Sequence, residues 1–430
     1  MNKWDKQIDR LVEYFRSGEK KLGEGKIGVE FEHLVLDGKT YETIPYRGPR
    51  GIAETFKDLE AKGWIGVYEG EDILGAEKGS TVISTEPALQ FEVSFNSEKC
   101  LSKLDDDYVS FIKEVEGVFH SKGQILAAIG YQPVTKIDEI EISPKRRYSY
   151  MYEHFKSKGS HAHNMMKGTA AVQVVIDYFS EEDFIRKFRI GNALSPILYN
   201  VFDNAYFFEG EKYKGNNLRQ LIWENTDSER SGVPAFAFDK DLSYASYAEY
   251  ILNNDIIFTD TDGHLEGTQG RPFKDMFDPD KASDKEILHA ISIVFPDLRL
   301  KKYLEFRMID SLPYPLNMAV TALIKGLMYS EMNLNSLEED FNEMTYKDLE
   351  EGRMQGKTRG IKGLYLGKTY LEWATYLYDL AYQALHKEER KYLKPMKKIL
   401  DQGKSPKDIF GQVLEKEGMD TAMDLVKVEV

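Results

Sequence analysis

Alternation of apolar residues with acidic or amide residues is the feature that most restricts how this chain can fold. In the segment KIGVEFEHLVL, residues 26–36, Glu30 and Glu32 are two positions apart. Side chains two apart in a β-strand point to the same face, so both carboxylates share one side and Val29 and Phe31 share the other. The segment therefore predicts a strand with one apolar face and one acidic face.

Three later segments repeat this pattern. In each of them, polar residues share the face opposite to the apolar residues: Gln90 and Glu92 in 83–95, Gln173 in 169–178, and Glu305 and Arg307 in 302–310. Glu86 precedes Gln90 by four positions, beside a proline. Four segments that are far apart in the chain thus predict strands whose polar faces carry mainly acids and glutamine.

Two explanations of these polar faces are open from the residues alone. An antiparallel sheet commonly has one solvated face, although such faces usually mix Lys, Thr and Glu. Alternatively, the acids gather on one concave face, where they would repel each other unless cations neutralise them. Hard oxygen ligands select Mg²⁺ or Mn²⁺ rather than zinc.

The segments together predict an α+β fold. Strand-like runs at 26–36, 81–95, 124–131, 169–178 and 301–308 alternate with helical patterns, and the part from about 315 reads almost wholly helical. Polar strand faces and turn-rich gaps favour an antiparallel or mixed sheet over a doubly wound one. We see no internal repeat or low-complexity linker, and predict one domain, 1–430.

Composition excludes several classes of protein. The net charge of −15 argues against nonspecific binding to nucleic acid or to anionic lipid. The first 15 residues are charged and amphipathic, unlike a signal peptide, and no run approaches the ~18 apolar residues of a membrane span. The single cysteine, Cys100, excludes an intrachain disulfide and a cysteine-clustered zinc site. We expect a cytoplasmic protein, a monomer or homodimer, without nucleic-acid or membrane partners.

Several ordered motifs carry a resemblance to a known family. The chain resembles the plant and proteobacterial type of glutamate–cysteine ligase over about residues 26–330. The motifs, in chain order, are IGVEFE, ISTEPALQFEVS, RYSYM, MMKGTAAVQV, DFIRKFRIGNAL, LRQLIWENTDSERSGVPAFAF and RLKKYLEFRMID.

The resemblance implies a fold and a reaction. The fold would have a glutamine synthetase-like catalytic core, an antiparallel sheet of about six strands bent into a funnel with helices around it. The reaction would join the side-chain carboxylate of glutamate to the amino group of cysteine. ATP would phosphorylate the carboxylate first, and the amine would then attack the acyl phosphate.

The resemblance also implies metal-binding residues. The positions that match the family's metal-binding acids are Glu30, Glu32, Glu86, Glu92 and Glu305. They would hold Mg²⁺, or Mn²⁺, against the phosphates of ATP. Arg307 would share a face with Glu305 and stabilise the transferring phosphoryl group. A salt bridge within the acidic cluster is the alternative for Arg307.

Further residues match the substrate pocket of the family: Gln173, Arg219, Trp223, Asp227, Arg230, Arg147 and Tyr148. Gln173 could coordinate the metal or hydrogen-bond substrate, and Arg219 could hold a carboxylate in a bidentate fork. A surface arginine and a core tryptophan are the alternatives for Arg219 and Trp223. Asp227 and Arg230 could bind a substrate amine or pair with each other.

Some positions depart from the family. Ala88 and Leu89 replace two glycines, Phe95 adds bulk after the Gln-Phe-Glu strand, and several polar positions around Gln173 are apolar in this chain. We therefore expect the metal and phosphate half of the site to be intact and the substrate half to be altered.

Three hypotheses for function follow. The first is an ATP-dependent glutamate–cysteine ligase, and the second is a related carboxylate–amine ligase with another acid or amine. The third is a nucleotide-binding homologue without catalysis. Glu305→Gln is expected to cripple turnover in an enzyme while leaving stability largely unchanged.

Overall fold

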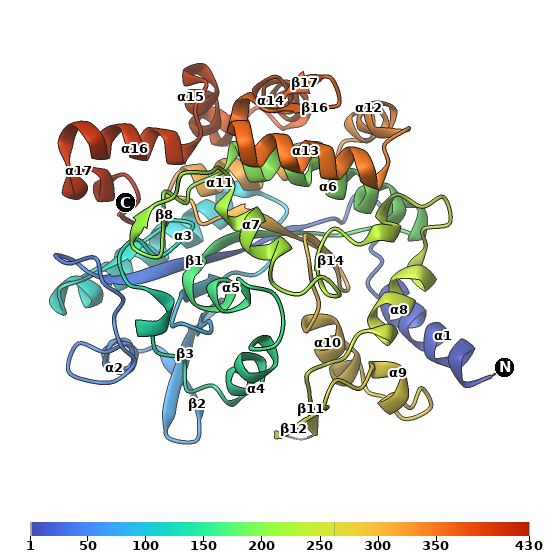
Figure 1. Ribbon diagram of the computed structural model, residues 1–430, viewed down its shortest axis with the longest axis horizontal. Helices are drawn as coiled ribbons and strands as arrows, with labels where there is room; N and C mark the ends of the chain where they lie inside the picture. Colours follow the sequence, from blue (N-terminus) through green and yellow to red (C-terminus); the bar gives the residue numbers. More distant parts are fainter. Residues whose placement is uncertain (1, 262, 430) are drawn as a thin grey trace.

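A sheet of antiparallel strands lies at the centre of the protein (Figure 1). A computed structural model describes residues 2–261 and 263–429. Within them the sheet has nine strands, in the order β14-β15-β7-β1-β5-β4-β3-β2, with β6 also paired to β1. Their bounds are β1 Ile27–Asp37, β2 Ile65–Glu69, β3 Asp72–Lys78, β4 Thr81–Thr85, β5 Phe91–Ser94, β6 Gln124–Ala127, β7 Ala171–Ile176, β14 Leu298–Leu300 and β15 Leu304–Asp310.

The predicted antiparallel sheet is confirmed, and the expected number of strands is too small. The run at 81–95 forms two strands, β4 and β5, because the chain turns at 86–90, where the Glu86 N–H donates to the Gln90 carbonyl. The hairpin of β2 and β3 was not predicted. β2 is largely exposed at the sheet edge, so its sequence lacks a buried apolar face.

Helices surround the sheet, and the predicted helical C-terminal part is present. The helices are α1 Lys3–Arg16, α2 Ile52–Ala61, α3 Leu101–Ser121, α4 Arg146–Phe155, α5 Ala162–Gly168, α6 Glu181–Val201, α7 Leu218–Glu224, α8 Tyr244–Asn253, α9 Phe273–Met276, α10 Asp284–Ser292, α11 Leu316–Met328, α12 Glu331–Phe341, α13 Tyr346–Arg359, α14 Tyr370–Ala384, α15 Lys394–Gln402, α16 Pro406–Glu417 and α17 Met419–Asp424.

Short two-stranded ribbons occupy the connections between the helices. They are formed by β8 Phe207–Phe208 with β9 Glu211–Lys212, β10 Ser231–Gly232 with β13 Phe295–Pro296, β11 Phe258–Thr261 with β12 His264–Gly267, and β16 Leu364–Tyr365 with β17 Lys368–Thr369.

The two faces of the sheet have different partners. Helices α3, α6 and α11 contact the strands on the apolar side, and α14 packs on α11 (Figure 1). One hydrophobic core includes Val29 and Phe31 of β1 and continues to residues of α14 and α15. Helices α4, α5 and α7 lie around the polar face, where a second cluster that includes Tyr148 and Trp223 packs. Short helices thus partly cover the polar face, whose acids Glu30, Glu32 and Glu92 stay partly exposed.

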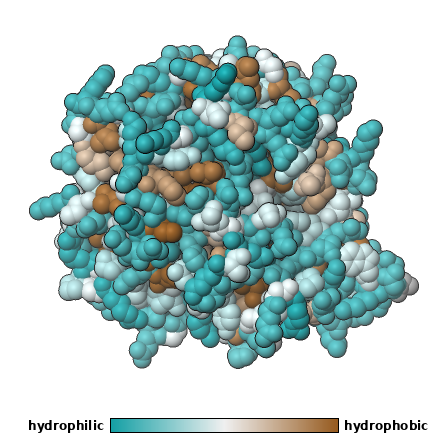
Figure 2. All heavy atoms as spheres, in the orientation of Figure 1, coloured by the Kyte–Doolittle hydropathy of each residue, from teal (hydrophilic) through white to brown (hydrophobic). Residues whose placement is uncertain are grey.

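The outer surface is mostly polar. Figure 2 shows a largely hydrophilic face on which hydrophobic residues are scattered. None of the helices in the described ranges combines the length and the apolar character that a bilayer span requires. The single-domain organisation stays a prediction.

Candidate functional site

Strand register brings the predicted acids together on the polar face. β1 lies between β5 and β7, and both pairings are antiparallel. Glu32 is directly opposite Glu92 of β5, and Glu30 is directly opposite Gln173 of β7. Directly opposed side chains in a sheet lie on the same face. Residues that are up to about 140 positions apart in the chain therefore become neighbours.

A cavity of about 230 Å³ lies over this face. Ten of the thirteen residues predicted for the site line it: Glu30, Glu32, Glu86, Glu92, Gln173, Arg147, Tyr148, Arg219, Trp223 and Arg307. An eleventh, Glu305, accepts a hydrogen bond from the lining residue Arg307. The helices α4 and α7 contribute the wall opposite the sheet. The structure thus unites most of the predicted residues in one place.

Four of the predicted metal-binding acids share an unusual electrostatic environment. None of Glu30, Glu32, Glu86 and Glu92 forms an ion pair with a Lys, Arg or His among the described residues, and each of them lines the cavity. Burial raises the pKa of Glu32 to about 7, and the charge of Glu86 adds to the rise. The pKa values of Glu30 and Glu92 are also raised, first by burial and then by neighbouring carboxylates. Nearby cations lower the pKa values of Glu30 and Glu32 in part, but none of them contacts these carboxylates as an ion pair.

The carboxylate oxygens of these four acids suit a divalent cation, although they are not grouped closely around one position. Carboxylate oxygens are the ligands that Mg²⁺ prefers, and a cation would remove the repulsion that raises the pKa values. In the described part of the chain, no three of these acids place ligand atoms within 4.8 Å of one another. Carboxylates that repel each other are expected to stand apart, so binding would draw them together.

Glu305 differs from the other four predicted metal-binding acids in its contacts. It is fully buried and its carboxylate contacts three cations: Arg299 at 2.6 Å, Lys301 at 2.8 Å and Arg307 at 3.2 Å. Burial alone would raise its pKa, but these charges outweigh burial and hold the pKa well below its usual range. A metal would have to displace the cations first, so the arrangement suits Glu305 as a positioning residue.

Arg307 forms the predicted alternative contact and lines the cavity as well. Its Nη1 donates to the Gln173 Oε1 at 2.6 Å and to Glu305 at 3.2 Å. Gln173 in turn donates to Glu32 Oε1 at 3.0 Å. The Arg307 Nε is buried and has no partner among the described residues. The Arg307 guanidinium is thus held in place through its Nη1, while its Nε remains available to donate a hydrogen bond.

Arg219 and Trp223 of α7 are buried at the cavity wall, so the surface alternative for Arg219 is wrong. Arg219 donates from Nη2 to the Arg307 carbonyl at 2.8 Å, while its Nη1 has no partner in the described ranges. The Trp223 Nε1 is also buried without a partner there. Leaving a buried donor unsatisfied costs about 1–3 kcal/mol. A ligand that offers acceptor oxygens would remove this cost.

Arg147 and Tyr148 close the cavity from α4. The Tyr148 hydroxyl donates to Glu86 Oε1 at 3.3 Å and to the Thr85 carbonyl at 3.2 Å. Burial and the charge of Glu86 raise the pKa of Tyr148 well above its usual value. The neutral phenol therefore holds Glu86 at the cavity, and Arg147 lies beside it with its Nε unpaired among the described residues.

Asp227 and Arg230 do not line the cavity. Arg230 donates from Nε to Asp227 at 2.7 Å, and it also pairs with Asp255. His154 and Lys158 each approach Asp227 at 3.4 Å. The structure therefore shows the alternative in which these two residues pair with each other, within a buried ionic cluster.

Arg299 and Lys301 are cavity residues that sequence reasoning did not single out. Both lie in the motif RLKKYLEFRMID, an even number of residues before Glu305. β14 and β15 form a hairpin in which Arg299 is directly opposite Glu305. Placing a tight turn at 301–303 would have predicted this pair. Met165 and Met166 of α5 also line the cavity, and no sequence signal pointed to them.

The departures from the family lie outside the cavity, which corrects the expected change in the substrate half. Leu89 and Phe95 belong to the hydrophobic core, and Ala171 contributes only its N–H, which donates to Glu32 at 2.8 Å. Leu89 has a φ of +68°. That conformation favours glycine, which explains why a glycine suits this position and why leucine is strained there.

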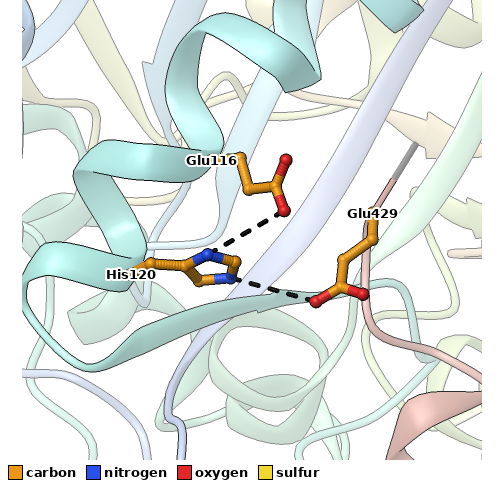
Figure 3. A group of neighbouring side chains, drawn as sticks. All are labelled: Glu116, His120 and Glu429. Carbon is orange, nitrogen blue, oxygen red and sulfur yellow. Dashed lines mark ion pairs between the residues drawn. The ribbon is translucent and has the colours of Figure 1, made fainter.

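Two other groups of possible metal ligands lie away from this cavity: Glu116, His120 and Glu429, which Figure 3 shows close together, and His161 with His163. The side chains of the first group are 31–49% exposed. The two carboxylates face opposite ring nitrogens of His120, at 3.8 Å and 3.9 Å, as in an ion-pair group. The His163 Nε2 donates to the Tyr152 carbonyl at 3.0 Å, and its ring stacks on the Tyr152 ring, as expected for a structural histidine.

Comparisons with known proteins identify the family of this chain. A family model described as Glutamate-cysteine ligase family 2 (GCS2) matches residues 26–425. The chain is 30% identical over 410 residues to glutamate–cysteine ligase B, chloroplastic, of Oryza sativa subsp. japonica, covering 92% of this chain and 82% of that protein. It is 31% identical over 363 residues to the chloroplastic glutamate–cysteine ligase of Arabidopsis thaliana, covering 82% of this chain and 68% of that protein.

A solved structure confirms the expected fold. The crystal structure of glutamate–cysteine ligase from Francisella tularensis in complex with AMP matches with a TM-score of 0.58 and 12% identity, covering 95% of this chain and 88% of that chain. With the matched family model and the similarity to the plant enzymes, this chain belongs to glutamate–cysteine ligase family 2.

Proposed function

We propose that this protein is an ATP-dependent ligase that joins the side-chain carboxylate of glutamate to the amino group of cysteine. Membership of the family supports this function. The observation that carries it is the cavity, in which carboxylates without cationic partners face buried arginine and tryptophan donors without partners in the described ranges.

The acids Glu30, Glu32, Glu86 and Glu92 would hold Mg²⁺ or Mn²⁺, and Gln173 would assist through its amide oxygen. Bound Mg²⁺ would neutralise charge on the phosphate oxygens of ATP. Glu305 would not be a ligand in this scheme. It would hold Arg299, Lys301 and Arg307 together, because its carboxylate contacts all three.

The cationic side of the cavity would stabilise the reacting groups. Arg307 is fixed by Gln173 and Glu305, so its free Nε is in position to meet charge that develops on the transferring phosphoryl group. Arg219 and Trp223 would donate to the carboxylate of an amino-acid substrate. The cysteine nitrogen would then attack the γ-glutamyl phosphate, and phosphate would leave.

An ADP-release assay tests this function. ADP should form only when glutamate, cysteine, ATP and Mg²⁺ are all present, and mass spectrometry should identify γ-glutamylcysteine. Equal turnover with aspartate, or with cysteine omitted, would contradict the proposal.

A variant pair tests the site. Glu92→Gln should lower kcat about 100-fold or more, because loss of metal-centred charge stabilisation amounts to several kcal/mol. It should also raise the Mg²⁺ concentration needed for half-maximal activity. The control Glu71→Gln changes an exposed residue outside the cavity and should behave as the wild type.

A further inference from the structure

A second cavity, of about 740 Å³, lies between the segment after β8 and the helices α13, α15 and α16. Figure 1 shows α16 beside β8, and an ion pair between Lys212 and Glu415 at 2.7 Å joins the two regions. This second cavity shares no lining residue with the cavity over the sheet. We call it the basic cavity.

The basic cavity concentrates positive charge in an acidic protein. The whole chain has a net charge of −15. Six cationic side chains line the basic cavity, namely Lys212, Lys214, Arg359, Lys362, Lys404 and Lys407, against the two carboxylates of Asp408 and Glu415. Both carboxylates are already engaged, since Glu415 pairs with Lys212 and Asp408 accepts from the Ser405 N–H.

Lys407 gives the cavity a buried charged group. It is 6% exposed. Its ammonium donates to the Gly215 carbonyl and lies 3.8 Å from Asp203. Burying an ammonium is costly unless acceptors surround it. A lysine held in this way presents a fixed positive charge at the cavity wall, unlike a lysine that extends freely into solvent.

Four other cations line the cavity without a carboxylate partner within 4 Å in the described part of the chain: Lys214, Arg359, Lys362 and Lys404. Lys404 donates to the Gln412 Oε1 at 2.7 Å. Arg359 is in the last turn of α13, where a cation is favoured by the helix dipole alone. The helix dipole cannot explain Lys214, because this residue lies in the connection between β9 and α7. Like charges that converge without counter-ions are destabilising, so a bound anion would stabilise this arrangement.

We propose that the basic cavity binds a small molecule that carries several phosphate or carboxylate groups. Its volume of about 740 Å³ is within the range of ligand sites. Lysine and arginine together suit such a ligand, because arginine binds an oxyanion through a planar fork and lysine as a point charge. The proposal stands independently of the ligase reaction.

Isothermal titration in low-salt buffer that has been passed over a chelating resin tests the proposal, with tripolyphosphate and citrate as separate probes. The resin removes the metal that would help an anion enter the acidic cavity and leaves no dissolved polycarboxylate to compete for the basic cavity. At least one probe should bind the wild type with 1:1 stoichiometry. The double variant Arg359→Glu/Lys362→Glu should weaken that binding at least tenfold. A response to tripolyphosphate alone identifies phosphate groups as the ligand chemistry, and a response to citrate alone identifies carboxylates.

A matched control has the same change of charge elsewhere. Lys387→Glu/Lys398→Glu alters two exposed lysines that do not line the basic cavity, and it should keep binding within twofold of the wild type. Equal weakening in both double variants, or no saturable binding of either probe to the wild type, would overturn the proposal. Binding that is lost in Arg307→Lys but kept in the Arg359→Glu/Lys362→Glu variant would also overturn the proposal, because the probe would then bind in the cavity over the sheet. Binding of polyglutamate without either small probe would assign the surface to a macromolecule and overturn it too.

Discussion

Replacing Glu32 with glutamine should make the metal-free protein progressively more stable than the wild type as the pH rises. Burial raises the pKa of Glu32 from about 4.5 to about 7 in the folded protein. Between these values the folded state holds the proton and the unfolded state does not, so the free energy of unfolding falls as the pH rises. This rise in pKa lowers the free energy of unfolding of the wild type by about 3 kcal/mol between pH 4.5 and pH 8. Glutamine cannot ionise and loses none of this stability.

Glutamine also has a cost that does not depend on pH. Glu32 accepts hydrogen bonds from the Ala171 N–H at 2.8 Å and from Gln173 Nε2 at 3.0 Å. An amide has one acceptor oxygen, so one of these donors would face the NH₂ group, at a cost of about 1–3 kcal/mol. The quantity to follow is therefore the change with pH in the difference between variant and wild type.

Chemical denaturation in EDTA, followed by far-UV circular dichroism, measures that difference. Subtracting the wild-type curve removes the contribution of other titrating groups, such as His33, whose pKa burial lowers to about 4. The difference should move by about 3 kcal/mol in favour of Glu32→Gln between pH 4.5 and pH 8. Exposed Glu71→Gln should give no trend. A difference for Glu32→Gln that stays constant across this range would refute the argument that Glu32 is buried without compensation.

Four further variants test other parts of the structure. Arg307→Lys should lower kcat by about 100–1,000-fold with an unchanged circular dichroism spectrum, because lysine cannot bridge both of its partners. Leu89→Gly should lower stability by about 1–3 kcal/mol in thermal unfolding, since relief of the positive φ offsets part of the lost burial, and KM should stay the same. Asp227→Asn should cost about 1–3 kcal/mol of stability, because buried Arg230 loses one of its two carboxylate partners and keeps Asp255, with little change in KM for either amino acid. Glu305→Gln should cost about 3–5 kcal/mol as well as turnover, measured by denaturation and ADP release.

Alternation along the strands predicted which residues share a face, and the structure agrees for Glu30, Glu32, Glu92 and Gln173. Alternation repeats every two residues, so it defines a face without defining the neighbouring strand. The pairing of Glu32 with Glu92 depends on the register between β1 and β5, which no local pattern reports. The family resemblance implied an antiparallel sheet but no order of strands, which the structure supplies.

Other features were not visible because they depend on contacts between distant segments. Arg230 matches the substrate pocket of the family by position, yet Asp255, 25 residues later, completes a buried ion-pair cluster around it. The edge strand β2 has no buried face to impose an alternating pattern. Leu89 stands in place of a glycine in the motif, which suggested a change in the pocket, whereas its side chain turns into the core.

Glu305 shows why matching a motif does not settle a role. An acid that binds a metal needs free oxygens, and both oxygens of Glu305 contact cations at 2.6–3.2 Å. Without this carboxylate, Arg299, Lys301 and Arg307 would repel each other and would be attracted to Glu30, whose pKa these cations already lower against the effect of burial. The resulting ion pairs would neutralise an acid that is proposed to bind Mg²⁺. Under that proposal Glu305 keeps the cations apart from the acids that would bind the metal, and its loss should therefore reduce both stability and turnover.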